Sequence, residues 1–346
     1  MKVAYIVLDP MKSTRLRKIV QSVRKCGGVV FCVMFPKVRF VWRGNKLGRL
    51  FIGVTNYLAF ILQIMLVKAD VFWVANCPDI FVLPLVLRKK RYVLDYRSPW
   101  ALQVKQEFGS GPWARLSAII EDIALRHAEM ITLTTSKLVT RVKRYGKPIY
   151  VIPNYPLKSF RVTVSKTEFR RSHSVSDSEK IVLFVGRLSR VEGADMLCDI
   201  VASVLKEASV MLWVVGDGPL YPLLERYKDK FPSNIRLFGW RSHEEIPNFI
   251  NASDVCIVPR HNVPYSYFYN EEGVTKISEY MFFGKPIVAC GIAESKQYLL
   301  VNEKEMAEGI MKALNEKVPS PTPKTWENYC EKKICELSGL LRSGNF

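Results

Sequence analysis

The sequence predicts an α/β protein with two domains in tandem, each built on a parallel sheet that is covered by helices. The chain has 346 residues, more than the roughly 250–300 that one hydrophobic core usually supports. Short apolar runs alternate with amphipathic segments through both halves of the chain. The apolar runs are continuous rather than alternating, which is typical of parallel strands that are buried on both faces.

The first domain is predicted over residues 1–156. Its first strand, expected over residues 3–8, is too short an apolar run for a signal peptide and ends at Asp9-Pro10. A basic helix is expected over residues 13–25. The further apolar runs predict strands at residues 29–35, 71–75, 91–94, 130–134 and 149–152.

One segment of the first domain, residues 51–67, carries no charge over 17 residues. A membrane-spanning helix needs about 20 apolar residues, and Thr55, Asn56 and Gln63 interrupt this segment. We therefore predict a helix that is buried against the sheet rather than a membrane span. Partial insertion at a membrane interface is a third possibility, because basic residues flank the segment on both sides.

The second half of the chain repeats the alternation of strands and helices. Residues 157–179 are rich in Ser, Thr, Arg and Lys, and we interpret them as the connection between the domains. The second domain is predicted over residues 180–318, with strands at 181–185, 210–215, 235–238, 255–259 and 286–289. Its helices are expected at 194–205, 220–230, 244–250, 276–283 and 303–315. A proline-rich stretch then opens the C-terminal segment 319–346, in which a closing helix is predicted near residues 325–341.

Both predicted domains are Rossmann-like. Ligands of open α/β sheets bind outside the carboxyl ends of the strands. Two such sheets that face each other would enclose an interdomain cleft, which suits a donor in one domain and an acceptor in the other.

Positive charge is concentrated in the first domain. The whole chain has a net charge of +19; residues 1–150 hold 26 basic and 8 acidic residues, whereas residues 181–346 hold 19 and 21. We interpret the first domain as a face for an anionic membrane, with aromatic residues such as Trp42 among its basic clusters. A solvated basic surface is the simpler alternative. Nucleic acid is not expected, because no nucleic-acid-binding motif accompanies the charge.

The cysteines and histidines give no sign of a metal site. The eight cysteines form no C-x-x-C pair, and several lie in apolar runs, so we expect the buried, reduced thiols of a cytoplasmic protein. The four histidines are scattered, and no His/Cys cluster has the spacing of metal ligands. We therefore expect neither a metal nor another cofactor.

Three motifs follow predicted strands and carry candidate chemistry. The first is GRLSRVEG at residues 186–193. Gly186 lets a ligand approach the backbone, and the helix that follows offers free N–H groups to a phosphate. Arg187 and Arg190 add cationic donors that suit a diphosphate. A plain strand–helix turn with solvated arginines explains this motif equally well.

The other two motifs lie further along the second domain. GDGPL begins at Gly216 and is a turn between a strand and a helix, which is a weak signal by itself. The third motif is NEEGVTKISEYMFFGKP at residues 270–286, in which seven residues separate Glu271 from Glu279. Glu271 is expected in the loop before a helix and Glu279 on the helix, so the two carboxylates could accept hydroxyl hydrogen bonds from different parts of one extended ligand. For either glutamate alone, a solvated surface charge is the alternative.

In this order and spacing the motifs resemble those of the retaining GT-B glycosyltransferases, in particular glycosyltransferase family four. The matching segments of the second domain are GRLSRVEG, GDGPL, NIRLFGW at 234–240, EEIPNFINASDVCIVP at 244–259 and EEGVTKISEYMFFGKPIVA at 271–289. The first domain is looser and matches through LDYR at 94–97, Glu121, ITLTTS at 131–136 and VIPN at 151–154. The resemblance implies a GT-B fold and transfer of a sugar from a nucleotide-sugar without a metal.

The resemblance also implies roles for particular residues. Glu279 would bind the nucleotide ribose, Arg187 would neutralise the leaving diphosphate, and Glu271 would bind the donor sugar. The full donor-binding set would be Gly186, Arg187, Gly216, Trp240, Ile246, Glu271, Glu272, Gly273, Val274, Thr275 and Glu279, with Trp240 and Ile246 beside the base. Asp95 and Arg97 would lie on the acceptor side.

Two positions depart from the family pattern. The family usually has a lysine where this chain has Glu192, and a glutamate there would repel the diphosphate unless it points away. Arg190 or Lys276 would have to replace that lysine, so the candidate catalytic residues are Arg187, Glu271, Arg190 and Lys276. The family's first-domain histidine is also missing, and Arg97 occupies the comparable stretch.

These features together predict a retaining glycosyltransferase of the hexosyltransferase class. It would move a hexose or N-acetylhexosamine from a UDP- or GDP-sugar to a lipid-linked or surface-glycan acceptor. The expected place is the cytoplasm, as a peripheral protein at the inner face of the membrane. The alternatives are a nucleotide-sugar-binding protein without turnover and a sugar-nucleotide epimerase, which needs no acceptor.

Overall fold

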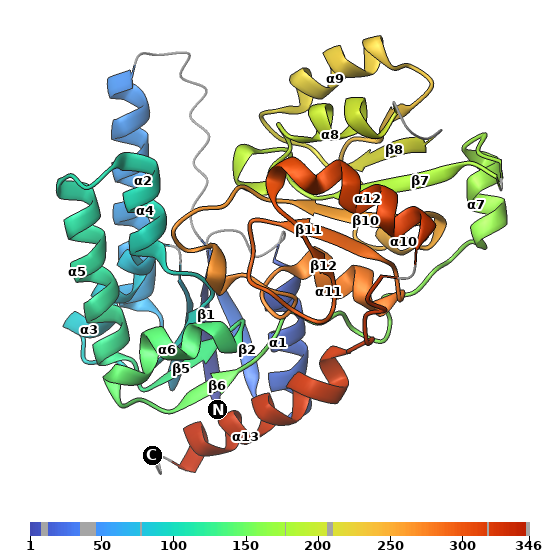
Figure 1. Cartoon of the computed structure of the whole chain (residues 1–346). Helices are drawn as coiled ribbons and strands as arrows, with labels where there is room; N and C mark the ends of the chain where they lie inside the picture. Colours follow the sequence, from blue (N-terminus) through green and yellow to red (C-terminus); the bar gives the residue numbers. More distant parts are fainter. Residues whose placement is uncertain are drawn as a thin grey trace. The chain divides into compact units, whose positions relative to one another are not determined.

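The computed structural model describes residues 1–7, 13–34, 46–76, 78–176, 178–205, 210–316 and 318–343. Trp42 and the basic residues around it lie outside these ranges. The chain divides into two compact units (Figure 1): unit 1 comprises Met1–Pro153 and Glu327–Phe346, and unit 2 comprises Asn154–Trp326. Each unit contains a six-stranded parallel sheet.

The sheet of unit 1 has the strand order β2-β1-β3-β4-β5-β6. The strands are β1 (Lys2–Val7), β2 (Val29–Met34), β3 (Val71–Ala75), β4 (Tyr92–Tyr96), β5 (Met130–Leu133) and β6 (Ile149–Val151). The helices are α1 (Thr14–Lys25), α2 (Lys46–Leu66), α3 (Leu83–Leu87), α4 (Trp100–Phe108), α5 (Pro112–His127), α6 (Val139–Val142) and α13 (Lys332–Ser343). Strands β3, β4 and β5 are buried along their whole length, as their continuous apolar runs predict.

The sheet of unit 2 has the strand order β12-β11-β10-β7-β8-β9. The strands are β7 (Lys180–Val185), β8 (Val210–Val215), β9 (Ile235–Leu237), β10 (Val255–Pro259), β11 (Ile287–Cys290) and β12 (Leu299–Leu300). The helices are α7 (Lys166–Ser172), α8 (Leu197–Val204), α9 (Tyr221–Lys230), α10 (Ile246–Ala252), α11 (Thr275–Phe282) and α12 (Met306–Asn315). Apolar side chains from both faces of this sheet form two clusters, so the sheet is the centre of the unit.

Helix α7 lies inside the stretch that we interpreted as an interdomain connection. Its N-cap Ser165 accepts a hydrogen bond from Glu168 N–H at 3.3 Å. Ser165 and Glu168 have the spacing of a capping box, which is a signal for the start of a helix. The helix was not predicted from this signal because the segment lacks the apolar periodicity of a helix. The buried Arg170 on α7 donates to the carbonyl of Ala252 at 2.9 Å, which ties the helix to α10 within unit 2.

Helix α2 is half buried, so the helix that was predicted to be buried against the sheet packs with one side only. Asn56, Phe60 and Ile64 are buried, whereas Leu58 and Leu62 are exposed. No helix among the described residues is long and apolar enough to span a membrane. Of the polar residues that argued against a span, Asn56 is buried, whereas Thr55 and Gln63 are exposed.

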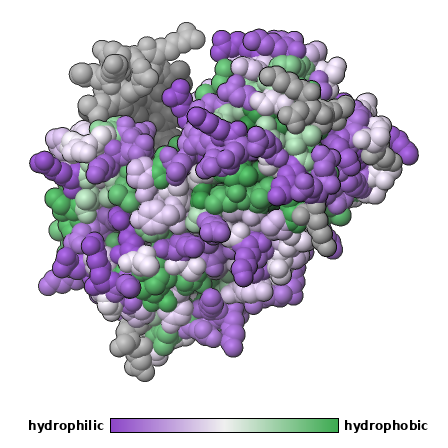
Figure 2. Space-filling model, in the orientation of Figure 1, coloured by the Kyte–Doolittle hydropathy of each residue, from purple (hydrophilic) through white to green (hydrophobic). Residues whose placement is uncertain are grey.

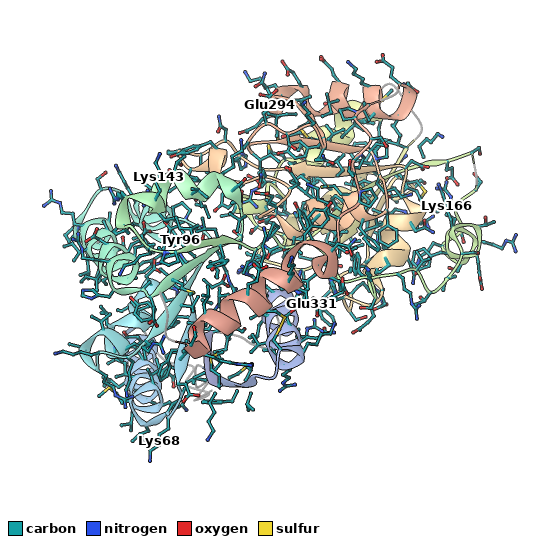
Figure 3. The ribbon with its side chains drawn as sticks, turned by 90° about the horizontal axis from the view of Figure 1, so that it is seen from below. Lys68, Tyr96, Lys143, Lys166, Glu294 and Glu331 are labelled. Carbon is teal, nitrogen blue, oxygen red and sulfur yellow. A yellow bond between two sulfur atoms is a disulfide. The ribbon has the colours of Figure 1, made fainter. Side chains whose placement is uncertain are left out.

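Two of the cysteines that were expected to be reduced form a disulfide. Cys26, which follows α1, is bonded to Cys335 on α13, with their Cα atoms 5.5 Å apart. The two helices contact each other (Figure 3), and Lys25 forms an ion pair with Glu331 at 2.6 Å beside the disulfide. The pairing could not be read from the sequence, because 309 residues separate the two cysteines.

Reduction of this disulfide is expected to destabilise unit 1. A cross-link between such distant residues restricts the unfolded chain strongly, and removal of a bond of this kind typically costs about 2–5 kcal/mol. Non-reducing peptide mapping should recover a peptide that links Cys26 with Cys335, and dithiothreitol should lower the melting temperature. The Cys26→Ser variant should melt at the lower temperature in both conditions. An unchanged melting temperature on reduction would contradict the stabilising role.

Candidate functional site

The glycine turns that end β7 and β8 pack directly against each other. Gly186 N–H donates to the carbonyl of Val215 at 2.9 Å, and Leu188 N–H donates to that of Asp217 at 3.0 Å. A Cβ atom on Gly216 would lie 1.8 Å from the carbonyl oxygen of Gly186, so no larger residue fits there. The first two motifs thus form one surface at the carboxyl ends of neighbouring strands.

The third motif is held in place by two asparagines. Asn154 N–H donates to the carbonyl of Glu272 at 2.7 Å, and its side-chain amide donates to that of Gly273 at 2.8 Å. The carbonyl of Asn270 accepts from Val274 N–H at 2.9 Å. These bonds fix the backbone just before α11.

The N-terminus of α11 is open. Its N-cap residue is Val274, which has no side-chain acceptor for the first turn. Among the described residues, no hydrogen bond is found for the backbone N–H groups of Thr275 and Lys276. Unpaired N–H groups and the positive end of the helix dipole make such an end suitable for an anion.

One buried carboxylate oxygen next to this helix end, Oε2 of Glu271, lacks a hydrogen-bond partner among the described residues. The buried Nζ of Lys276 lies 2.9 Å from Oε2 of Glu192, with which it forms an ion pair. A Cβ atom on Gly186 would lie only 2.7 Å from Nζ, so the ammonium reaches the first motif. Buried polar groups normally have partners, and a bound ligand would supply one for Oε2 of Glu271 here.

Glu192 is paired with two cations. Its Oε1 lies 2.7 Å from Nη1 of Arg260 and its Oε2 lies 2.9 Å from Nζ of Lys276. Burial by itself raises the pKa of Glu192, but the charges of Lys276 and Arg260 outweigh burial and lower it to about 2. The carboxylate is therefore ionised at neutral pH, and the group of three carries one net positive charge. The repulsion that we expected from an isolated glutamate is offset by this pairing.

Glu279 lies one helical turn after Lys276, on the same side of α11. Its side chain is buried, and its Oε1 shares a hydrogen bond with Nε2 of His243 at 2.8 Å. The ring of Phe160 stacks on the His243 ring at 4.8 Å between centroids. The hydrogen bond engages one carboxylate oxygen and fixes the orientation of the other.

The predicted base-flanking residues differ in exposure. Trp240 follows Gly239, whose φ of 67° is left-handed, and the Trp240 side chain is 72% exposed. Ile246 is buried at the start of α10. An exposed tryptophan beside a strand end is available for stacking on a flat ligand.

The two arginines of the first motif are exposed. Among the described residues, no ion pair is found for Arg187, whereas Nε of Arg190 lies 4.0 Å from Asp195. Asp195 also contacts Nε2 of His261 at 3.1 Å. Arg187 thus remains free to bind an anion, while Arg190 already has a nearby carboxylate.

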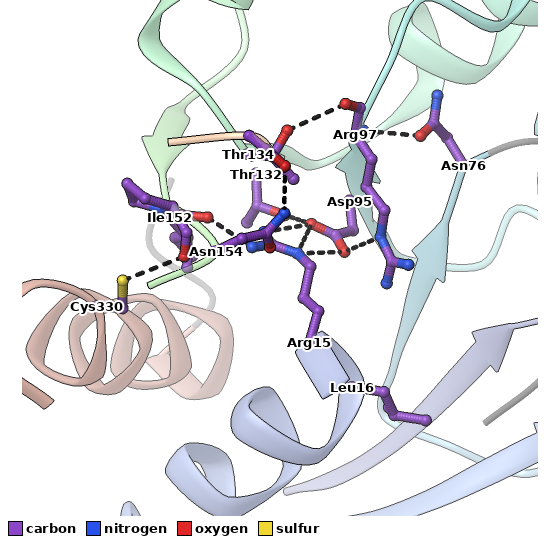
Figure 4. A network of polar contacts seen from close by, with 12 residues as sticks. Arg15, Leu16, Asn76, Asp95, Arg97, Thr132, Thr134, Ile152, Asn154 and Cys330 are labelled. Carbon is purple, nitrogen blue, oxygen red and sulfur yellow. Dashed lines mark hydrogen bonds and ion pairs between the residues drawn. The ribbon is translucent and has the colours of Figure 1, made fainter. Parts of the chain in front are cut away.

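Asp95 and Arg97, the residues predicted on the acceptor side, belong to a polar network within unit 1 (Figure 4). Asp95 is fully buried and accepts from Nη2 of Arg15 at 2.7 Å, from Nε of Arg97 at 2.8 Å and from Oγ1 of Thr132 at 2.8 Å. Burial raises the pKa of Asp95, but the two arginines outweigh it and hold the pKa well below its ordinary value. The contacts of this carboxylate thus connect α1, β4 and β5, whereas the Arg97 side chain remains partly exposed.

The sequence did not predict three residues that contact candidate site residues: Arg15, His243 and Arg260. His243 and Arg260 follow β9 and β10, at the strand ends where ligands of α/β sheets bind. A search for charged residues just after each predicted strand would have found Arg260. No local signal pairs Arg15 with Asp95, because 80 residues separate them.

The fold places the chain in a known class of enzyme structure. HepE of Anabaena, solved in complex with UDP-glucose, superposes with a TM-score of 0.70 at 16% identity, over 99% of this chain and 100% of that one. WaaG, a glycosyltransferase involved in lipopolysaccharide biosynthesis, superposes with a TM-score of 0.63 at 14% identity, over 99% and 96%. Two six-stranded parallel sheets and these likenesses confirm the GT-B fold.

Part of unit 2 also matches a family of known sequences. Residues 179–316 match the family model of glycosyl transferases group 1. All three motifs lie within this matched segment. The α-D-kanosaminyltransferase of Streptomyces kanamyceticus is 28% identical over 127 residues, which are 36% of this chain and 31% of that protein. The chain thus matches about a third of the length of this curated relative.

Proposed function

We propose that the protein transfers a hexose or N-acetylhexosamine from a UDP- or GDP-sugar, with retention of configuration and without a metal. The observation that carries the proposal is the segment from Glu271 to Glu279 in unit 2. It combines an open helix N-terminus, the buried ammonium of Lys276, and two carboxylates, of which Glu271 has an oxygen without a partner among the described residues. Amides and an ammonium suit a diphosphate, and carboxylates suit the hydroxyls of a sugar and a ribose.

The chemistry of the step assigns a role to each charge. Cleavage of the sugar–diphosphate bond places negative charge on the diphosphate, and fixed cations stabilise that charge without reorganisation. Arg187 and Lys276 supply the cations, and the first N–H groups of α11 add to them. Glu192 and Arg260 hold Lys276 in position, so that Lys276 takes the part of the lysine that the family has at position 192.

Glu271 and Glu279 bind the two ends of the donor in this proposal. The unpaired Oε2 of Glu271 accepts from a hydroxyl of the transferred sugar. Glu279, oriented by His243, accepts from the ribose hydroxyls, and the exposed Trp240 stacks on the base. The UDP-glucose bound to HepE supports a UDP-sugar as the first donor to test.

The acceptor is proposed to be a lipid-linked or surface glycan at the cytoplasmic face of a membrane. The excess of basic residues in the first 150 positions supports this assignment, because a lipid-linked acceptor brings anionic phosphate and a membrane surface together. The part that WaaG plays in lipopolysaccharide biosynthesis is a precedent for a glycan acceptor on this fold.

Release of the nucleotide from a donor panel tests the proposal. The protein is incubated with UDP- and GDP-linked hexoses and N-acetylhexosamines, with and without a polyprenyl-phosphate-linked sugar, in buffer that contains EDTA. We expect UDP or GDP release from one donor that rises when the acceptor is added. Binding without release across the panel would favour a binding protein. Conversion of the donor sugar to its epimer without an acceptor would favour an epimerase.

A further inference from the structure

The outer side of α2 is mostly apolar, with exposed Thr55 and Gln63 among its apolar residues, although the helix already buries its opposite side. The exposed large residues are Val54, Leu58, Leu62, Met65 and Leu66; Leu58 and Leu62 are each 58% exposed and Leu66 is 71% exposed. Their spacing of three and four residues places them in one stripe. An exposed helix normally carries polar residues on this side, so the stripe is suited to a partner.

The apolar surface continues on the neighbouring helices. Helix α3 packs against α2 and also contacts α5. Leu87, at the end of α3, is 82% exposed, and α5 exposes Trp113, Leu116 and Ile119 along one side. Figure 2 shows apolar surface, in green, along the edge of unit 1 where α5 lies. We call the outward sides of α2, α3 and α5 the apolar face.

Basic residues border the apolar face where α2 ends. Nη1 of Arg88 donates to the carbonyl of Ile64 at 3.0 Å, which holds the turn after α3 against the C-terminal end of α2. The exposed Lys89 and Lys90 follow in this turn, and the exposed Lys68 follows α2 (Figure 3). Apolar and cationic side chains are therefore adjacent.

A depression of about 520 Å³ opens beside this turn. Its charged and titratable lining residues are Lys89, Lys90, Arg91, Tyr92, His127, Glu129 and Lys147. Glu129 is paired with Arg91 at 2.9 Å, so the lysines leave the depression with a positive charge. A depression of this charge suits the phosphate of a lipid headgroup.

We infer that the apolar face docks on an anionic lipid bilayer, with its leucines and Trp113 in the headgroup region and lipid phosphates at the turn that carries Lys89 and Lys90. The inference rests on the proposed function, because a lipid-linked acceptor places the enzyme at a membrane. Charge favours a bilayer over a second copy of the chain. A symmetric dimer through this face would bring its lysines together, whereas anionic lipids would neutralise them.

Vesicle flotation tests the inference with the full chain. The probes are vesicles of phosphatidylcholine alone and of phosphatidylcholine with phosphatidylglycerol. We expect the wild type to float with the anionic vesicles. The Leu58→Gln/Leu62→Gln variant should bind about tenfold more weakly in low and in high salt. The Lys89→Gln/Lys90→Gln variant should lose about tenfold in low salt only. The matched control is Val162→Gln, an exposed apolar residue of unit 2, which should float like the wild type.

Several outcomes would overturn the inference. One is wild-type protein that does not float with anionic vesicles, and another is a leucine variant that floats equally well. A concentration-dependent dimer that the leucine substitutions abolish, seen by light scattering, would assign the face to a second copy. A melting temperature for each variant controls for folding. Vesicle binding needs no donor, so flotation would be unchanged if the proposed sugar transfer were wrong. A failure of the membrane inference can therefore be distinguished from a failure of the proposed function.

Discussion

Replacement of Lys276 by methionine is expected to lower kcat by about two to three orders of magnitude at saturating donor. The reason is that the buried ammonium would stabilise the charge that develops on the leaving diphosphate, and methionine fills a similar volume without a charge. The measurement is nucleotide release with the donor and acceptor that the panel identifies. An effect on kcat rather than on KM would indicate an interaction that strengthens in the transition state.

Stability has to be separated from catalysis in this variant. Loss of one partner from a buried charged group costs about 3–5 kcal/mol, and Lys276→Met leaves Glu192 with Arg260 alone. The double variant Glu192→Gln/Lys276→Met removes both charges, so its melting temperature should recover while its turnover stays low. The double variant Glu192→Lys/Lys276→Met places a lysine where the family that the sequence resembles has one. Its kcat should be about tenfold higher than that of Lys276→Met.

The outcome that excludes this role is simple. Wild-type turnover in Glu192→Gln/Lys276→Met would mean that Lys276 only balances the charge of Glu192. Full turnover in Glu192→Gln alone would keep Lys276 as the phosphate cation and remove Glu192 as its positioning residue.

Replacement of Glu279 by alanine is expected to weaken nucleotide binding by about 10- to 100-fold, because the ribose loses charge-assisted hydrogen bonds. In a thermal-shift panel, one series of UDP or GDP ligands should stabilise the wild type, and the shift should disappear in the variant at the same ligand concentration. Glu279→Gln, which keeps the shape but loses the charge, should lie between the two.

The control for Glu279 is Glu225→Ala, which removes an exposed glutamate from α9 in the same unit. Its thermal shift should equal that of the wild type. A shift in Glu279→Ala as large as that of the wild type would remove the ribose assignment, and the His243 hydrogen bond would then be a purely structural contact.

Local sequence was enough for most of the fold. Continuous apolar runs predicted the buried strands of both sheets, because each run has the length of one strand and is bounded by turn residues. Gly186 was predicted to let a ligand approach the backbone, whereas the packing of Gly216 against the Gly186 carbonyl was not predicted. The sequence predicted a helix in residues 51–67, but the tertiary structure decided which side faces the core: Phe60 and Ile64 are buried, and Leu58 and Leu62 are exposed.

The sequence by itself determined the α/β class, the order of the strands along the chain and the positions of the three motifs, since these depend on neighbours within one element or turn. Only the tertiary structure decided that Glu192 pairs with Arg260, that Glu279 meets His243 and that Cys26 is bonded to Cys335, across 68, 36 and 309 residues. For Glu192 and Arg260 the physical reason is that β10 lies beside β7 although β8 and β9 come between them in the chain. Cys26 and Cys335 meet because the C-terminal helix α13 belongs to unit 1 and packs against α1. Side-chain partners at strand ends follow from this spatial order, which no local period encodes.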